Sequence, residues 1–195
     1  VAPVSFTGTK VYDTNTNFAF GTFGTAGTIN ALGTETLLLS GTGTVASKDV
    51  VSGSQTVDTT ALALNDVVLT GGLASNYTFV GGTQTAAVTP ARLNVIADPQ
   101  SKLFGASDPA LTFTVTGLVS NPLPGVTDTV AGVFSGALTR IPGESALGGP
   151  YSITLGTLAA NANYSLGFTP GAFTIIGAAA EPVLGFNAPQ VTFAG

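Results

Sequence analysis

Residues 111–116 form the sequence Leu-Thr-Phe-Thr-Val-Thr, in which apolar and polar side chains alternate at every position. Successive side chains of a β-strand point to opposite faces of the sheet, so this pattern places all the apolar side chains on one face. Thr, Val and Phe also favour strands, because their side chains suit a pleated surface. The stretch therefore predicts a half-buried β-strand.

The same alternation recurs along the chain, at residues 77–80, 86–89, 152–155 and 173–176. Between such stretches the chain is interrupted by turn-forming residues, and it contains 26 Gly and 11 Pro in 195 residues. Short strands separated by Gly and Pro turns are typical of sandwiches and small barrel-like modules. We therefore predict an all-β fold.

The composition excludes several classes of function. The chain has 5 basic and 10 acidic residues, a net charge of −5, and neither His nor Cys. The usual zinc, haem, iron–sulfur and blue-copper sites then lack ligands, and Ser–His or Cys–His catalytic pairs cannot form. The basic residues are too few to bind nucleic acid or an anionic membrane surface. We expect no enzyme activity, no cofactor or metal, no nucleic-acid partner and no membrane insertion.

The two halves of the chain follow one plan. Residues 9–13 (Thr-Lys-Val-Tyr-Asp) and 101–105 (Ser-Lys-Leu-Phe-Gly) share the order hydroxyl, Lys, apolar, aromatic, then a turn residue. Asn76-Tyr77 and Asn163-Tyr164 recur at a similar spacing near the end of each half. A period of about 90 residues indicates tandem modules, because the repeats of solenoids are shorter.

Proline and glycine mark the boundaries that this plan requires. Pro90 holds the preceding residue extended and suits a short, stiff linker between two modules. We therefore predict one β module over residues 1–90 and a second over 91–177. Residues 178–195 are expected to form a linker and the start of a following module, since residues 188–195 resemble residues 2–8.

Four short motifs of the first half, at residues 11–13, 45–50, 76–78 and 88–90, follow one another in a characteristic order. On these motifs the first half resembles the YDG domain of large bacterial adhesins. The Gly that usually follows Tyr-Asp in this family is replaced by Thr14. The turn at this position must therefore reach its geometry without glycine.

The second half has its own series of motifs, at residues 102–105, 108–111, 134–138, 149–153, 156–158 and 163–164. On these motifs it resembles the MBG domain of the YGX type. The Tyr-Gly of the family is Phe104-Gly105 here, which keeps the ring and loses the hydroxyl.

Together the two resemblances cover residues 4–177 and imply a segment of a filamentous-haemagglutinin-like adhesin. Such proteins are secreted by two-partner systems of Gram-negative bacteria. The resemblance implies no catalytic residues, and it leaves an immunoglobulin-like sandwich and a β-grasp-like arrangement both open for each module. Low charge and abundant Thr and Gly are likewise typical of exported β-proteins, so we expect a secreted or cell-surface location.

Two tyrosine motifs could contact a ligand, but a structural role is expected for each. Tyr12 is predicted to pack in the core while Asp13 caps a turn through its carboxylate. Asn76-Tyr77 and Asn163-Tyr164 would suit sugar stacking. Their recurrence in both halves favours a corner instead, in which the tyrosine hydroxyl bonds to the backbone of a distant turn.

Acidic and basic side chains offer two further candidate sites. Asp98, Asp108 and Asp128 could surround calcium, but no alternating acidic loop brings six oxygens together. Lys10, Lys48 and Lys102 lie in apolar sequence surroundings with many Asn residues in the chain, which raises the hypothesis of a Lys–Asn amide crosslink. A solvated lysine with an apolar stem is the interpretation that we favour.

Two functions fit these sequence features. The first is a structural stalk or spacer that projects a distal adhesive tip in cell attachment or biofilm, with neighbouring modules of the same chain as partners and glycan or host surfaces contacted through other regions. The alternative is a glycan- or host-protein-binding adhesive module. Its candidate residues are Phe18, Phe20 and Phe23, although the face of Phe18 and Phe20 is expected to be core.

Overall fold

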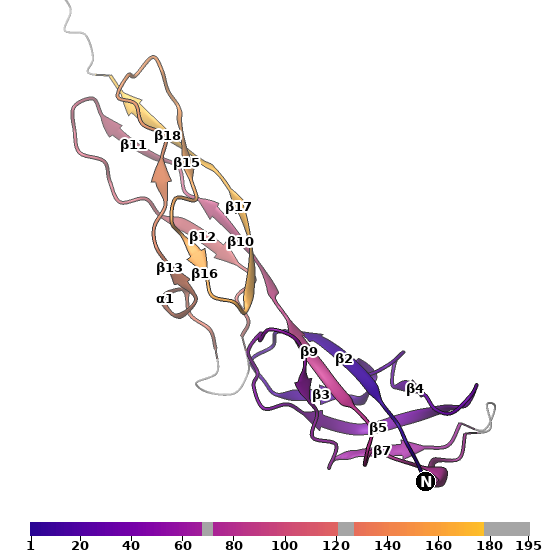
Figure 1. Ribbon diagram of the computed structural model, residues 1–195. Coiled ribbons are helices and arrows are strands. Elements are labelled where there is room, and N and C mark those ends of the chain that lie inside the picture. Colours follow the sequence, from indigo (N-terminus) through magenta and orange to yellow (C-terminus); the bar gives the residue numbers. More distant parts are fainter. Residues whose placement is uncertain (68–71, 121–126, 178–195) are drawn as a thin grey trace, which may run out of the picture.

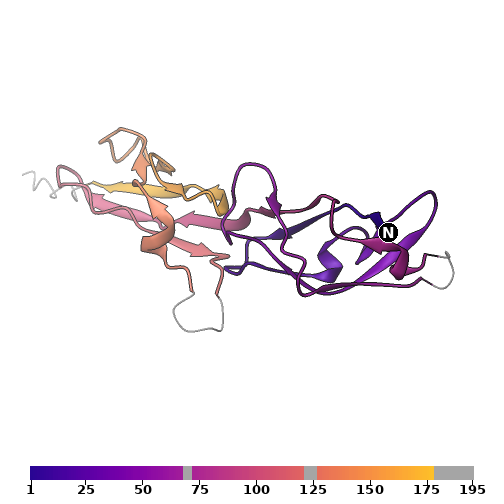
Figure 2. The ribbon, with the colours of Figure 1, turned by 60° about the horizontal axis from the view of Figure 1, so that its bottom comes forward.

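The computed structural model describes residues 1–67, 72–120 and 127–177, which form two β modules arranged end to end (Figure 1). The N-terminus lies at one end of the elongated molecule, and the last strand runs toward the opposite end. A second view, turned by 60°, shows the same elongated arrangement (Figure 2). The prediction of an all-β fold of two tandem modules is therefore confirmed.

The first module contains nine strands and two short 3₁₀ helices within its described residues. Its elements are β1 (Ala2–Pro3), β2 (Phe6–Val11), β3 (Asn17–Ala19), η1 (Phe20–Thr22), β4 (Thr28–Asn30), β5 (Thr36–Thr44), β6 (Gln55–Thr56), β7 (Leu62–Asn65), η2 (Ala74–Asn76), β8 (Tyr77–Thr78) and β9 (Gln84–Thr89).

The second module contains nine strands and one short α-helix within its described residues. Its elements are β10 (Ala91–Ala97), β11 (Gln100–Leu103), β12 (Phe113–Thr116), α1 (Val130–Val133), β13 (Phe134–Ser135), β14 (Thr139–Arg140), β15 (Tyr151–Thr154), β16 (Ala159–Ala160), β17 (Tyr164–Thr169) and β18 (Gly171–Ile176).

The two modules share the way in which their first two strands pair with their last two. β1 pairs in parallel with β8 and β2 in parallel with β9. In the second module β10 pairs in parallel with β17 and β11 in parallel with β18. The register is also equivalent, because Ala2 lies opposite Tyr77 and Ala91 lies opposite Tyr164. The repeated sequence motifs thus correspond to a repeated pairing pattern.

The remaining strands complete small sheets within each module. In the first module the orders are β2-β9-β6 and β3-β5-β4, with β7 paired to β5. In the second module they are β12-β10-β17, β11-β18-β15-β14 and β13-β16. Among the described residues no strand pair joins one module to the other, and β9 continues into β10 through Pro90.

Two tandem modules would each be expected to have an apolar core of its own, but the main core is continuous across the joint. The main cluster fills the first module around Phe18, Phe23 and Leu37, and it continues across the joint to Leu93 and Tyr164 of the second module. A separate cluster lies farther out in the second module and consists of Ala97, Ile153, Phe173 and Ile175. The modules are therefore linked by packing as well as by the chain.

Two local sequence predictions can be compared with the structure. The alternating stretch at residues 111–116 forms a strand only over Phe113–Thr116, and its apolar face is half-buried, as predicted. Thr14, which replaces the usual glycine, has a φ of 65° and is buried. The turn after Tyr12-Asp13 therefore keeps the left-handed geometry that glycine favours, although a threonine adopts it at a steric cost.

Residues 178–195, which we expect to form a linker and the start of a following module, lie outside the described residues. In the described ranges, no helix is long and apolar enough to span a bilayer.

The separate core of the second module makes a stability prediction. Phe173 is fully buried in this cluster, so Phe173→Ala is expected to lower the free energy of unfolding by about 3–5 kcal/mol. Phe104 is exposed, so the matched change Phe104→Ala is expected to alter it by less than about 0.5 kcal/mol. Urea unfolding followed by circular dichroism measures both. Equal effects of the two substitutions would contradict this assignment of the core.

Candidate functional site

A group of aromatic and polar side chains lies at the joint between the modules. Tyr12, directly after β2, and Tyr164, the first residue of β17, meet edge to face with ring centroids 5.5 Å apart. Both rings are buried. Aromatic pairs in this geometry contribute about 0.5–1.5 kcal/mol beyond the area that they bury. This contact carries the core cluster from one module into the other.

An asparagine bridge lies beside the two rings. The Asn163 side chain donates from Nδ2 to Oδ1 of Asp49 at 2.8 Å. The Asn163 Oδ1 atom accepts from the backbone N–H of Val50, also at 2.8 Å. One carboxamide thus uses both its donor and its acceptor on two consecutive residues of the other module. Such a two-point contact fixes orientation as well as distance.

Lys48 supports this bridge from the first module. Its Nζ atom lies 2.9 Å from Oδ1 of Asp49 and 3.4 Å from the Tyr12 hydroxyl. It also lies 5.4 Å from the centroid of the Tyr12 ring. The hydrogen bond from Lys48, followed by that from Asn163, lowers the pKa of Asp49. The Asp49 carboxylate is therefore held in the charged form that accepts the bond from Asn163.

The tyrosine corners predicted from sequence are present in both modules. The Tyr164 hydroxyl accepts from the backbone N–H of Val119 at 3.0 Å and donates to Asp128 at 2.6 Å. The Tyr77 hydroxyl accepts from the backbone N–H of Leu32 at 3.4 Å and donates to Glu35. Each tyrosine therefore anchors a distant turn and an acid, and the corner prediction is confirmed.

Asp128 affects both tyrosines of the joint. Burial is the main cause that raises the pKa of Tyr164, and the hydrogen bond to Asp128 raises it further. Burial also raises the pKa of Tyr12, where hydrogen bonding with Asp128 acts in the same direction and Lys48 opposes it. Both phenols thus remain protonated donors beside a carboxylate.

The prediction for Tyr12 and Asp13 is also confirmed. Tyr12 belongs to the core, and Asp13 accepts a hydrogen bond from the backbone N–H of Asn15 through its carboxylate. The two motifs that recur in sequence are therefore structural, but they meet at the joint, because Tyr12 of one module contacts the Asn-Tyr corner of the next.

Two lysines expected to be solvated have nearly buried side chains. The Lys10 side chain is 8% exposed, and its Nζ atom lies 2.7 Å from Asp13, 2.9 Å from the Asn15 side chain and 4.8 Å from the centroid of the Phe18 ring. Nζ also donates to the backbone carbonyls of Asn15 and Asn17. The amide crosslink remains a hypothesis.

Lys102 occupies the equivalent place in the second module, with a side chain that is 6% exposed. It pairs with Asp108 at 2.6 Å and Glu144 at 2.7 Å, and Arg140 pairs with the same two acids at 2.6 Å each. Arg140, followed by Lys102, lowers the pKa of Asp108, and the pKa of Glu144 is also lowered. The four charges hold the loop that contains Glu144 against the strands.

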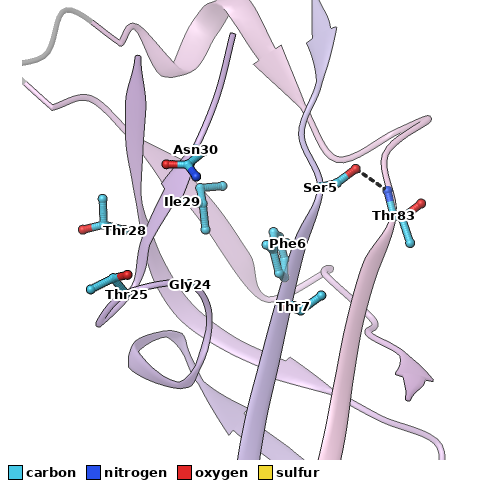
Figure 3. A pocket seen from close by; sticks show the side chains of 9 residues that line it. All are labelled: Ser5, Phe6, Thr7, Gly24, Thr25, Thr28, Ile29, Asn30 and Thr83. Atoms are coloured by element: carbon cyan, nitrogen blue, oxygen red, sulfur yellow. Dashed lines mark hydrogen bonds between the residues drawn. The ribbon is translucent and has the colours of Figure 1, made fainter. Parts of the chain in front are cut away.

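A groove of about 400 Å³ lies in the first module between β2 and β4 (Figure 3). Its lining residues are Ser5, Phe6, Thr7, Gly24, Thr25, Thr28, Ile29, Asn30 and Thr83. The lining contains five hydroxyls and one amide, and none of these nine residues is charged. The Phe6 ring is buried against Phe23, with centroids 4.9 Å apart, so it offers no free face for stacking on a sugar.

The aromatic residues that are candidates for an adhesive surface do not form one. Phe18 and Phe23 are fully buried in the core. Strand β3 ends at Ala19, so Phe20 begins the η1 turn, where it is exposed while Phe18 is fully buried. The expectation that Phe18 and Phe20 share one strand face is therefore wrong for Phe20, because the strand ends between them.

The acids that are candidates for calcium binding have separate partners. Asp98 accepts a hydrogen bond from Thr114, Asp108 pairs with Lys102 and Arg140, and Asp128 accepts from Tyr164. Over residues 1–67, 72–120 and 127–177 no group of three or more metal-ligating side chains is found.

Sequence reasoning missed the partnership of Asn163 with Asp49 and Val50. Asp49 belongs to one motif, and Asn163 belongs to the repeated Asn-Tyr pair. Nothing in the local pattern connects residues that lie more than a hundred positions apart. One feature of the sequence could have indicated this contact. Asn precedes Tyr in both modules, and because the corner needs only the tyrosine, the recurring Asn points to a separate role.

Comparison with known families gives two matches. Residues 1–87 match the family model described as the YDG domain, and residues 93–174 match the model described as the MBG domain (YGX type). No curated protein and no solved structure showed a significant match.

The raised pKa of Tyr164 makes a prediction about alkaline pH. The unfolded chain loses this phenolic proton near the ordinary value of 10, while the folded chain keeps it to higher pH. Stability from Tyr164 is therefore fully present below about pH 10 and falls as the pH rises toward the folded pKa. As the pH rises from about 9 to about 12, the free energy of unfolding is therefore expected to fall less for Tyr164→Phe than for the wild type.

At neutral pH the same substitution should cost about 1–3 kcal/mol, because it leaves Asp128 and the Val119 N–H without the hydroxyl. Tyr151→Phe is the matched control, since its hydroxyl contacts the backbone of Ser145 in an exposed loop and its loss should cost less than about 1 kcal/mol. Urea titrations at each pH measure these values. An identical alkaline slope in wild type and Tyr164→Phe would refute the assignment.

Proposed function

Since the chain consists of a YDG domain followed by an MBG domain of the YGX type, we propose that it is a stalk segment of a large secreted bacterial adhesin. Domains of these kinds are typical of extracellular surface proteins and suggest an adhesin-like protein built of repeats. In this proposal the two modules are a stiff spacer that holds a distal adhesive tip away from a Gram-negative cell in attachment or biofilm.

The observation that carries this proposal is the packed joint. Two separate connections link the modules, namely the backbone through Pro90 and the side-chain contacts that Asn163 and Tyr164 make with the first module. A single covalent linker leaves a hinge, whereas a second, directional contact restricts rotation about it. The spacer therefore holds one orientation between its modules.

The dimensions of the modules support a spacer. A domain of about 90 residues has a radius of gyration near 12 Å and is about 30 Å across. Two such modules in line, as in Figure 1, reach about 60 Å. A longer array of similar modules would extend in proportion.

The strand pairing supports a load-bearing role. Because β2 and β9 are parallel neighbours, tension applied to the two ends of the first module pulls them past each other and loads their hydrogen bonds together. The pair β11 and β18 has the same geometry in the second module. Hydrogen bonds that are loaded together must break together. A module held by such bonds resists unfolding under tension better than one whose hydrogen bonds break one after another.

Several further features belong to the proposal. We assign the chain no catalytic activity and no cofactor, and we take neighbouring modules of the same chain as its partners. Secretion by a two-partner system is part of the same proposal and rests on the resemblance to filamentous-haemagglutinin-like proteins. Without cysteine, the spacer has no thiol chemistry that an oxidising environment could change.

The joint can be tested with spin labels, because a chain without Cys allows two to be introduced at chosen sites. Thr9→Cys in β2 and Thr174→Cys in β18 place labels on exposed side chains of the two modules. Electron–electron double resonance is expected to give a narrow distance distribution. Asn163→Ala removes both bonds of the bridge and is expected to broaden this distribution at least about twofold.

Asn76→Ala is the matched control, since Asn76 is the equivalent residue in the first module and is exposed at the far end. It should leave the distribution unchanged. A broad distribution in the wild type would show that the modules are hinged and would overturn the stiff spacer.

A second candidate function is binding of a short neutral glycan in the groove between β2 and β4. The observation that favours it is the uncharged lining of this groove, which includes Thr7, Thr25, Thr28 and Asn30. A glycan array probed with the full chain should then give specific hits that Asn30→Ala weakens about tenfold, while Asn76→Ala leaves them unchanged. An array without hits would remove this candidate and leave the spacer.

A further inference from the structure

Large apolar side chains are exposed where the chain leaves the second module. We call this surface the exit patch and define it as Leu103, Phe104, Leu147 and Ile176. Leu103 lies opposite Ile176 in the β11–β18 pair. The loop that carries Leu147 also reaches this end of the module. Its residue Ala146 lies beside Gly177, since a Cβ atom added to Gly177 would be 3.6 Å from the Cβ of Ala146.

Phe104 is the structural equivalent of Tyr12. Tyr12 follows β2, and its N–H donates to the carbonyl of Thr89 at the end of β9 at 2.8 Å. Phe104 follows β11, and its N–H donates to the carbonyl of Ile176 at the end of β18 at 2.9 Å. Tyr12 is only 3% exposed because the second module covers it, whereas Phe104 is 63% exposed.

The loop that carries Leu147 is equivalent to the loop that carries Val50. Residues 45–54 lead into β6, the antiparallel partner of β9. Residues 141–150 lead into β15, the antiparallel partner of β18. Val50 packs against the core cluster at the joint, whereas Leu147 is 99% exposed. Tyr12 and the loop that carries Val50 both contact the second module. Their counterparts at the exit patch, Phe104 and the loop that carries Leu147, are exposed.

The entry end of a module has the complementary features. In the second module it presents Asn163-Tyr164 to Tyr12 and Val50. In the first module Asn76 is exposed, and Tyr77 forms the same corner with Leu32 and Glu35. A module of this architecture thus presents an Asn-Tyr corner at its entry end whether or not another module covers it.

We propose that the exit patch docks the entry end of a following module of the same architecture, with the Asn-Tyr corner of that module packed against Phe104 and Leu147. The proposal rests on the stalk function and gives it a repeating interface. At the joint between the exit patch and a following module, Phe104 supplies a ring without a hydroxyl, so this joint is more apolar than the one at Tyr12.

The size of the patch indicates that the partner lies in the same chain. Stable complexes of separate proteins use about 20–30 residues on each side, whereas the exit patch consists of four apolar side chains. A short linker raises the effective concentration of a neighbouring module into the millimolar range, where a weak interface suffices. Docking is therefore expected within a chain and not between separate chains.

A tandem chain tests the proposal directly. Residues 1–177 are joined to residues 2–195 of a second copy, so that Ala2 follows Gly177 as Ala91 follows Pro90. Labels at Thr174→Cys of the first copy and Thr9→Cys of the second span the new joint. Electron–electron double resonance is expected to give a narrow distance distribution there, and Phe104→Ser in the first copy is expected to broaden it at least about twofold.

Phe20→Ser in the first copy is the matched control, because Phe20 is also exposed but lies in the first module, away from the new joint. It should leave the distribution narrow. A second labelled pair, at Thr9→Cys and Thr174→Cys of the first copy, reports the natural joint in the same tandem chain.

The outcomes separate this proposal from the stalk function. A broad distribution at the new joint beside a narrow one at the natural joint would overturn the docking proposal and leave the spacer intact. A narrow distribution that Phe104→Ser does not change would also overturn it, because the patch would then have no part in the joint. Broad distributions at both joints would overturn the spacer itself.

Discussion

In both modules the second strand and the last strand run side by side in the same direction and exchange backbone hydrogen bonds, β2 with β9 and β11 with β18. Parallel neighbours start at the same end of a sheet, so a chain that enters a module at one end must leave it at the other. Antiparallel first and last strands would return the chain to its entry end, and successive modules would then lie side by side. The linear arrangement in Figure 1 follows from these two pairings.

The same pairing decides which residues can meet at a joint. A side chain just after the early strand, such as Tyr12, lies at the exit end beside the last strand. A side chain just before the penultimate strand, such as Asn163 before β17, lies at the entry end. Because both positions are fixed by the strand register, equivalent residues of any further module would occupy equivalent places.

Much of the fold could be predicted from local patterns, because alternation and turn residues act over a few positions. The tyrosine corner was also within reach, since a motif that recurs in both halves suggests a shared structural role. The joint could not be predicted from the sequence, because the contact of Asn163 with Asp49 depends on how two folded modules meet. The buried lysines were missed for a related reason, since the acceptors that enclose Lys102 come from loops that the fold brings together.

The joint shows how a small interface can orient two modules. The rings of Tyr12 and Tyr164 supply apolar contact, which is favourable but tolerates sliding. The Asn163 bridge adds little net free energy, because its hydrogen bonds replace bonds to water. Asp49 and Val50 are only partly buried, so water can replace these partners in another orientation, but only the observed orientation allows both bonds of Asn163 to form together. Orientation is therefore set by where the two bonds of Asn163 can form, and the covalent link at Pro90 supplies the proximity that so small a contact area could not.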